Sequence, residues 1–420
     1  MVSKRTTSTA LLAGGVLLFV LTFVGGAALA PTIGVADDGD ETRRTLVGSQ
    51  GGGAGLHERG SVYLLDGTNQ TWRSWSAASY FDVTMLDNGS VLAGFMDTGY
   101  GECGPYEPPC TRTGFRIVDP EPEPRVVHEY SFPVRTGQNS EVHDVEPLPG
   151  GGYVLADMEH ERVVTVENGE ITWQWNASSY YEAPEDPTKV DWLHINDVDR
   201  IGEDRYLVSV RNANQILIVE RGKGVVDVIN EDRNPRHLNH QHNPQWLGDG
   251  AVLVADSEND RIVELHRNDD GGWEVAWALY EAEGVSFAWP RDADRLPNGN
   301  TLITDSANQR LVEVDPDGEV VWSYRTDYVP YEAERLPEGE TVGAPLYGES
   351  GVPNGPVAPG ENGAGAPDRG VPVLSSLLQV LRTSFPLPFW LSEVHLLLSL
   401  VSLAMIVAGG ALRLRLRLRS

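Results

Sequence analysis

The stretch RDADRLPNGNTLITD at residues 291–305 decides the fold, because it has the pattern of a strand, a tight turn and a second strand and recurs along the chain. Two related copies are HDVEPLPGGGYVLAD from His143 and HNPQWLGDGAVLVAD from His242. The six copies begin, in chain order, at Phe81, His143, Asn196, His242, Arg291 and Tyr331. These starts are 62, 53, 46, 49 and 40 residues apart, which is the period of a four-stranded propeller blade. The sequence therefore predicts an all-β fold, a six-bladed β-propeller at residues 57–348.

The outer strands of the blades follow the copies. Most copies continue with a third strand, such as RVVTV at 162–166, and a fourth that carries tryptophan, such as EVVWSY at 319–324. The copy at Tyr331 stops after its first strands, whereas residues 61–75 supply two outer strands with no inner strands before them. Joining the two ends completes the sixth blade and leaves no exposed sheet edge.

Apolar segments near both chain ends predict an association with the membrane. Residues 1–30 are expected to be a signal peptide cut near Ala30 or an uncleaved anchor, because an apolar run follows two basic residues. Residues 387–420 are expected to form a transmembrane helix with a basic tail, which the positive-inside rule places in the cytoplasm. The propeller would then lie outside the cell. The expected linkers are 31–56 and the Gly/Pro-rich 349–386, the latter with a short amphipathic segment.

The net charge of −29 is concentrated between these apolar ends, where 60 acidic side chains accompany 26 basic ones. Such a surface repels nucleic acid, so no nucleic-acid partner is expected. Three lysines accompany 29 arginines, and this bias, with abundant Asp and Glu, predicts a halophilic protein that stays soluble in concentrated salt.

Two further features agree with an external domain. Asn69, Asn88 and Asn176 begin glycosylation sequons. Cys103 and Cys110 are the only cysteines and lie in one loop, where they either close a small disulfide or remain free. Two cysteines alone are a poor metal site.

The histidines gather at the predicted axis. The first strand of each propeller blade lines the central channel, so the six copy starts form a ring at one mouth. His194 and His240 lie two residues before ring positions, which brings four of the ten histidines to this mouth. One strand later, Asp157, Arg211, Asp256 and Asp305 are assigned to aligned positions. The aspartates are expected to tie turns together, and Arg211 is interpreted as a replacement of such an aspartate.

This set of side chains predicts group transfer. A neutral imidazole is a nucleophile near pH 7, a second imidazole can move a proton, and arginine can hold an anion. Sulfuryl or phosphoryl transfer fits these roles. The sequence contains no P-loop, GxSxG, HExxH or Rossmann motif, and no cofactor is expected.

Residues 140–325 resemble the PAPS-independent arylsulfate sulfotransferases, of a haloarchaeal-type, membrane-anchored kind. The resemblance lies in His143-Asp144, His194-Ile195-Asn196-Asp197, Arg211, Gln241-His242-Asn243 and the Pro-Asn-Gly-Asn turn at 297–300. It implies ping-pong transfer of a sulfuryl group from an aryl sulfate donor to a phenol acceptor through a sulfohistidine. The chain departs from the bacterial enzymes in lacking a large N-terminal β domain and in carrying a C-terminal anchor.

The resemblance also implies roles for individual residues. His242 corresponds to the nucleophile, and His240 is a competing candidate. Arg211 would stabilise the sulfuryl charge and His143 would handle the phenol proton. His194 and Asn196 would contact the sulfuryl group. The other ring residues Arg291, Phe81 and Tyr331 are expected to bind substrate.

Two other interpretations stay open. A noncatalytic surface propeller would bind a glycan or a protein. A metal-dependent hydrolase or lyase would use His143, His194, His240 and His242 as ligands, since His-x-His on a strand puts both rings on one face. The sequence leaves the natural substrates and the oligomeric state undetermined.

Overall fold

The computed structural model of the chain describes residues 4–30, 36–37, 43–52, 56–186, 189–248, 250–347, 372–384, 387–388 and 390–418. It contains two compact units, one made of residues 33–367 and the other of residues 1–32 with 368–420. Residues 349–371 of the predicted linker lie outside the described residues.

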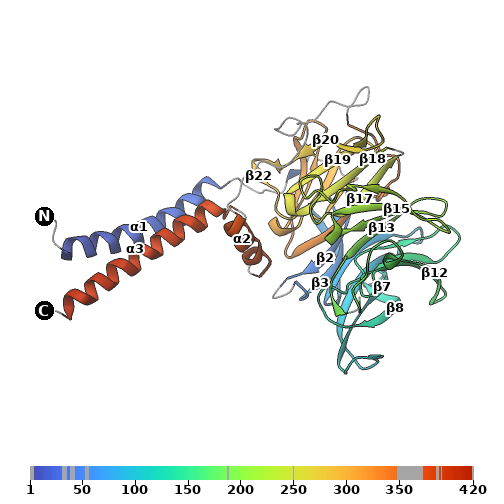
Figure 1. The fold of residues 1–420 in the computed structure, drawn as a ribbon, viewed down its shortest axis with the longest axis horizontal. Helices are drawn as coiled ribbons and strands as arrows, with labels where there is room; N and C mark the ends of the chain where they lie inside the picture. Colours follow the sequence, from blue (N-terminus) through green and yellow to red (C-terminus); the bar gives the residue numbers. More distant parts are fainter. Residues whose placement is uncertain are drawn as a thin grey trace. The chain divides into compact units, whose positions relative to one another are not determined.

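The larger unit is a six-bladed β-propeller of four-stranded antiparallel sheets, so the predicted fold is confirmed (Figure 1). Five blades are continuous in sequence. They are β5 (Ser79–Met85), β6 (Val91–Tyr100), β7 (Cys110–Asp119) and β8 (Arg125–Val134); β9 (Val145–Pro147), β10 (Tyr153–Asp157), β11 (Arg162–Glu167) and β12 (Glu170–Asn176); β13 (Ile195–Gly202), β14 (Arg205–Val210), β15 (Gln215–Glu220) and β16 (Gly224–Ile229); β17 (His242–Gly248), β18 (Ala251–Asp256), β19 (Arg261–Arg267) and β20 (Trp273–Leu279); and β23 (Asp292–Arg295), β24 (Thr301–Asp305), β25 (Arg310–Val314) and β26 (Val320–Arg325). Short additions are β1 (Ala36–Asp37), which pairs with β26, and a hairpin of β21 (Glu281–Ala282) and β22 (Val285–Ser286).

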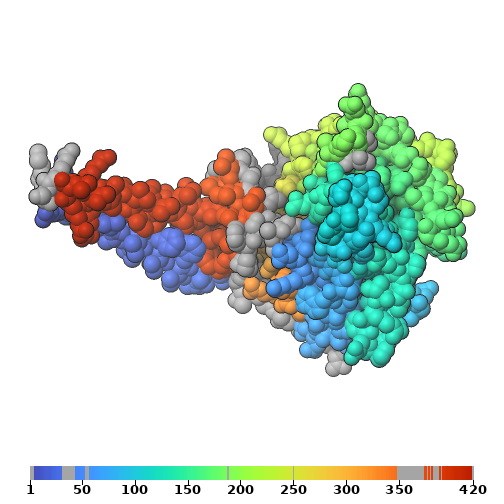
Figure 2. Space-filling model, turned by 90° about the horizontal axis from the view of Figure 1, so that it is seen from below, coloured from blue at the N-terminus to red at the C-terminus, as the bar shows by residue number. Residues whose placement is uncertain are grey.

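The sixth blade joins the two ends of the propeller. Its strands are β27 (Val329–Leu336), β2 (Arg44–Gly51), β3 (Gly60–Asp66) and β4 (Asn69–Ala77), in that order. Figure 2 shows the orange C-terminal part of the propeller beside its blue N-terminal part. The C-terminal end thus supplies one strand of this blade and the N-terminal end three.

The predicted linker at 31–56 is therefore wrong over β2. Seven of the eight residues of β2 are buried. Its sequence, RTLVGSQG, is accordingly rich in small residues and lacks the alternation of polar and apolar residues that marks a half-exposed strand. Leu46 packs with Tyr80 and Phe95 of the next blade, whereas Val47 packs with Leu302 and Trp322 of the preceding blade. A strand that is buried on both faces cannot be recognised by the period-two pattern.

Aspartate–arginine pairs fix the end of the second strand in three blades. Arg162, Arg261 and Arg310 each donate from Nε to the Oδ2 atom of Asp157, Asp256 and Asp305, respectively, at 2.7 Å. In β14 the matching cross-strand pair is Val210 with Gln215. The residue that replaces the aspartate is thus Val210, and the alignment of Arg211 with the aspartates was wrong by one residue.

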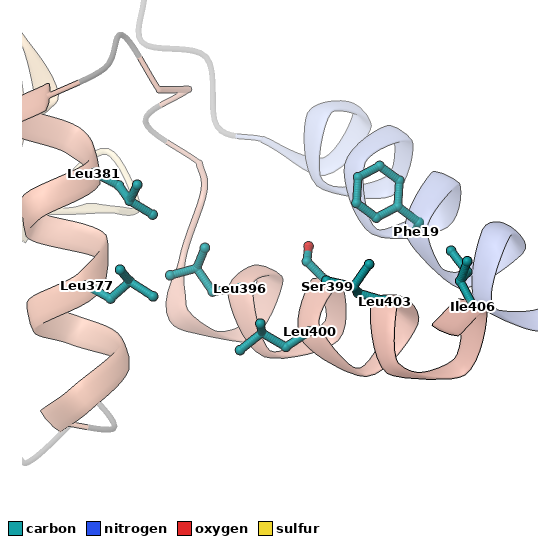
Figure 3. Close-up of a pocket in the computed structure, with 8 residues that line it drawn as sticks. All are labelled: Phe19, Leu377, Leu381, Leu396, Ser399, Leu400, Leu403 and Ile406. Carbon is teal, nitrogen blue, oxygen red and sulfur yellow. The ribbon is translucent and has the colours of Figure 1, made fainter. Parts of the chain in front are cut away.

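The smaller unit consists of helices. α1 (Lys4–Leu29) and α3 (Glu393–Arg417) are each long and apolar enough to cross a membrane, and they run side by side in opposite directions (Figure 1). α2 (Pro372–Ser384) falls in the predicted amphipathic segment. This unit also contains an apolar groove of about 510 Å³, which has no candidate site residue in its lining. Figure 3 shows the residues that line it, which are Phe19, Leu377, Leu381, Leu396, Ser399, Leu400, Leu403 and Ile406.

Cys103 and Cys110 form a disulfide in the loop between β6 and β7. Asn69, Asn88 and Asn176 are all exposed at the ends of strands or in a turn, and their glycosylation stays a prediction.

The buried aspartate–arginine pairs predict that removing a single negative charge strongly lowers the free energy of unfolding. Asp256→Asn should lower the free energy of unfolding by about 3–5 kcal/mol, because it leaves the guanidinium of Arg261 buried without its charge partner. Both side chains are fully buried. Asp119→Asn is the matched control, since its pair with Arg125 is exposed and should contribute less than about 1 kcal/mol. Chemical denaturation in concentrated salt measures both, and equal losses would contradict this account.

Candidate active site at the propeller axis

The six predicted ring positions meet at the axis. We call Phe81, His143, Asn196, His242, Arg291 and Tyr331 the axial ring, and each of these residues is at most 4% exposed. The ring centroid of His143 lies 4.6 Å from that of Phe81 and 4.9 Å from that of Tyr331. Tyr331 also lies 6.2 Å from His242, and the Arg291 guanidinium lies 5.0 Å from the Tyr331 ring. Asn196 donates from Nδ2 to the backbone carbonyl of Gln241 at 2.9 Å.

A second row lies two residues before the axial ring in three consecutive blades. This mouth row consists of His194, His240 and Trp289, whose φ angles of 57°, 50° and 53° are all left-handed. Such a conformation is uncommon for residues other than glycine and costs energy. The mouth row also lies against the axial ring, since His194 is 5.7 Å from His143 and the Arg291 guanidinium is 3.7 Å from the Trp289 ring.

The preceding blade holds each residue of the mouth row in place. The Glu161 carboxylate accepts hydrogen bonds from the backbone N–H of His194 at 2.7 Å and of both neighbours of His194. Asn214 accepts from the N–H of His240 at 2.9 Å, and Asp260 accepts from that of Trp289 at 2.8 Å. The repeated bond explains how three strained residues persist at one place.

His57 joins the site although sequence reasoning missed it. Its Nδ1 atom lies 2.7 Å from Ser79 Oγ, its Nε2 atom lies 3.1 Å from Glu141 Oε1, and its ring is 6.4 Å from Phe81. Sequence reasoning also missed Trp289, Ser257 and Gln50, because none of them is the first residue of a copy of the repeat. The signal for Trp289 was its place two residues before Arg291, which matches the spacing of His194 and His240.

The ring histidines are held neutral. Burial lowers the pKa of His143 well below its usual value, against the opposing effect of Glu141. Burial also lowers the pKa of His242 well below its usual value, with Arg291 and Arg211 adding to the shift. Both ring nitrogens of His143 are buried and lack a hydrogen-bond partner among the described residues. His143 is therefore available to a ligand.

Ser257 sets the tautomer of His242. Ser257 Oγ donates its single hydrogen to the backbone carbonyl of Pro290 at 2.7 Å, so it accepts a hydrogen bond from His242 Nδ1 at 2.8 Å. His242 Nδ1 therefore carries the proton and Nε2 carries the lone pair. Ser257 follows Asp256 just as Arg211 follows Val210, so Arg211 and Ser257 occupy equivalent positions in neighbouring blades.

Two guanidinium groups bring positive charge to this region, where Glu141, Asp191 and Glu258 also lie. Burial lowers the pKa of Arg291 to about 10, which leaves Arg291 charged at neutral pH, and its guanidinium donates to Gln50 Oε1. Arg211 Nη2 lies 3.9 Å from Glu258 Oε1, and Arg211 contributes to the lowered pKa of both His240 and His242. The arrangement can hold an anion beside neutral imidazoles and aromatic rings.

The other two predicted histidines, His194 and His240, lie beside the axial ring and form hydrogen bonds through Nδ1. His194 Nδ1 lies 2.9 Å from Asp191 Oδ1, and His240 Nδ1 lies 3.0 Å from Asn239 Oδ1. Within the described ranges, no three His, Cys, Asp or Glu side chains are arranged to hold a metal ion. The four histidines are therefore not a preformed metal site.

Comparisons with known proteins leave the family open. No protein-family model and no curated protein matches the chain. A solved protein of unknown function from Bacteroides caccae is 15% identical with a TM-score of 0.48, over 67% of this chain and 93% of its own. The periplasmic gluconolactonase of Pseudomonas aeruginosa is 13% identical with a TM-score of 0.43, over 70% and 99%. The virginiamycin B lyase of Staphylococcus aureus is 9% identical with a TM-score of 0.37, over 59% and 69%. At these values the likenesses carry no argument about activity.

The neutral state of His143 predicts a pH dependence of stability. The unfolded chain takes up a proton on this histidine below about pH 6.5, whereas the folded chain does not, so folding is weakened as the pH falls. Relative to His143→Leu, the wild type should lose up to about 1.4 kcal/mol of unfolding free energy per pH unit below about pH 6. Denaturation curves at several pH values measure this difference, and a difference that is constant with pH would contradict the buried neutral imidazole.

Proposed function

We propose that this protein is a PAPS-independent arylsulfate sulfotransferase that uses His242 as its nucleophile. The observation that carries the proposal is the hydrogen bond from His242 Nδ1 to Ser257, which leaves a lone pair on Nε2 of a neutral imidazole. Arg291, which shares the axial ring with His242, supplies a fixed cation for an anionic group. His240 is the weaker candidate, because it is less buried than His242 and lies two residues outside the axial ring.

The first half-reaction forms a bond to His242. The Nε2 lone pair attacks the sulfur of the aryl sulfate, and the bond between sulfur and the aryl oxygen breaks with its electron pair on that oxygen. The phenolate leaves, and sulfohistidine remains. Arg291 and Arg211 offset the negative charge of the sulfuryl oxygens, and His194 and Asn196 are proposed to contact them.

The second half-reaction regenerates the free imidazole of His242. His143 takes the proton of the acceptor phenol, the phenol oxygen attacks sulfur, and the bond between nitrogen and sulfur breaks with its electron pair on Nε2. Burial lowers the pKa of His143, so it begins each turnover unprotonated at neutral pH and does not retain the proton. The proton passes to water, and the phenolate released in the first half-reaction takes up a proton there.

Aromatic side chains support an aryl substrate. Phe81 and Tyr331 lie 5.4 Å apart in the axial ring, and Trp289 lies 6.5 Å from His242 in the mouth row. Since His242 is 1% exposed, substrate entry requires the mouth row to move aside. Trp289 is the side chain whose displacement would uncover both His242 and Arg291.

We also propose that the protein is anchored in the cell membrane with its propeller outside. The two apolar helices support the anchoring, and the basic residues that follow α3 support the orientation by the positive-inside rule.

A chromogenic aryl sulfate with a phenol acceptor tests the proposal. His242→Ala should lower turnover by at least about a thousandfold, because it removes the nucleophile, whereas His240→Ala should retain turnover. His128→Ala, at an exposed position of β8, is the matched control. The purified full chain is assayed in detergent and concentrated salt, with and without a chelator.

Three outcomes separate the alternatives. Equal turnover in His242→Ala and His128→Ala would contradict the proposed nucleophile. Loss of turnover with the chelator at an unchanged unfolding temperature would favour a metal-dependent hydrolase or lyase. Inactivity of the wild type with all substrates and salts would favour a noncatalytic binding propeller.

A further inference from the structure

Acidic side chains line the channel just beyond the axial ring. The residues that directly follow the ring positions are Asp82, Asp144, Asp197, Asn243, Asp292 and Glu332, and each is at most 8% exposed. Two residues further along the inner strands, the acidic set continues with Glu146, Asp199, Asp294 and Glu334. Buried carboxylates are costly unless each has a partner, so the partner of each one matters.

Several of these side chains tie neighbouring blades together. Asp82 Oδ2 accepts a hydrogen bond from the backbone N–H of Val145 at 3.2 Å, and Asp144 Oδ2 accepts one from Val198 at 2.6 Å. Asp292 Oδ2 accepts one from Ala333 at 3.1 Å. In every case the donor lies two residues after the ring position of the next blade. These carboxylates are therefore structural.

The junction between β13 and β17 breaks this pattern. The donor that Asp197 would use belongs to residue 244, which is Pro244 and has no N–H. Asp197 Oδ2 consequently has no hydrogen-bond partner among the described residues, and neither does Asp199 Oδ2 on the same strand. The two side chains are only 4% and 5% exposed, so bulk water does not supply the missing hydrogen bonds.

Asn243 supplies an independent third oxygen. Its Nδ2 atom lies 3.5 Å from Glu332 Oε2, which belongs to the blade two positions further round the ring, so the amide points into the channel. Its Oδ1 atom is buried and also lacks a partner among the described residues. Three buried oxygens without a partner among the described residues thus belong to the adjacent inner strands β13 and β17.

We propose that Asp197, Asp199 and Asn243 bind a Ca²⁺ ion in the central channel. Calcium takes six to eight oxygen ligands in flexible geometry, so two carboxylates and one amide leave room for water. Magnesium fits less well, because it demands near-ideal octahedral geometry and gives up water reluctantly. The ion would join β13 to β17, directly beneath Asn196 and His242.

Calcium titration of the full chain tests this site. After removal of divalent ions with a chelator, the wild type in detergent and potassium chloride should bind Ca²⁺ saturably, and its unfolding temperature should rise with Ca²⁺ concentration. Asp197→Asn with Asp199→Asn should weaken binding by about tenfold or more. Asp66→Asn, at an exposed position, is the matched control. Calorimetric titration showing no saturable binding by the wild type, or equal affinity in the double variant and the control, would overturn the proposal.

Pro244→Ala tests the same site without changing its charge. Alanine restores the backbone N–H that the other blade junctions use, so Asp197 Oδ2 gains a competing partner and calcium affinity should fall. Unchanged affinity in a folded Pro244→Ala protein would contradict the role of Asp197 as a ligand. Neither result depends on sulfuryl transfer, so the two proposals can fail separately.

The helical unit carries a second, independent inference about α1. Ser8 Oγ donates to the backbone carbonyl of Gly409 at 2.8 Å, and Ser402 Oγ donates to that of Gly15 at 2.7 Å. A Cβ atom on Gly15 would lie 2.9 Å from Ser402 O, and one on Gly409 would lie 3.0 Å from Leu12 N. Close backbone approach at small residues, with serine bonds across the contact, is typical of helix pairs within membranes.

We infer that α1 is retained as an anchor paired with α3 and is not removed as a signal peptide. Removal would leave the Gly409 and Ser402 face of α3 without the helix that it fits. Intact mass measurement of the protein from its native membrane should find α1 present, and a chain that begins after Ala30 would overturn this inference.

Discussion

The antiparallel pairing of β27 with β2 is the contact on which the rest of the propeller depends. It places Ala333 opposite Val47 and Glu334 opposite Leu46, residues from the two ends of the domain, and so closes six sheets into a ring. Closure brings Tyr331 against Phe81, His143 and His242 at the axis. Without this pairing, β2 would expose two apolar faces and an unpaired edge, and the candidate site would lack one side.

Closure also creates the electrostatic character of the site. Because the axial ring is buried, imidazoles there lose the water that would stabilise their charged form, and Arg211 and Arg291 oppose protonation further. The hydrogen bonds between blades hold His194, His240 and Trp289 in left-handed conformations around this ring. The neutral imidazoles, the buried guanidinium groups and the strained mouth row thus all follow from the way in which neighbouring blades meet.

The residues that recur in each blade could be predicted from the sequence, whereas the contacts between neighbouring blades could not. The six copy starts were recognisable because a turn motif follows each of them, and these residues do form the axial ring. Arg211 was misaligned by one residue. The position that corresponds to Asp157, which pairs with Arg162, is held by Val210, which pairs with Gln215. His57, Ser257 and Trp289 act through contacts with other blades, which no local pattern encodes. The acidic residue after nearly every copy start was visible, but its partners, and the break at Pro244, require the folded ring.

The residue to which a sulfuryl group becomes covalently bound tests the proposed mechanism most directly. The wild type is incubated with an aryl sulfate in the absence of any acceptor, digested rapidly, and analysed by mass spectrometry over residues 238–246. We predict one added SO₃ group on His242, and none in His242→Ala. An unmodified peptide from a preparation that turns over once an acceptor is added, or modification on His240 instead, would contradict His242 as the nucleophile.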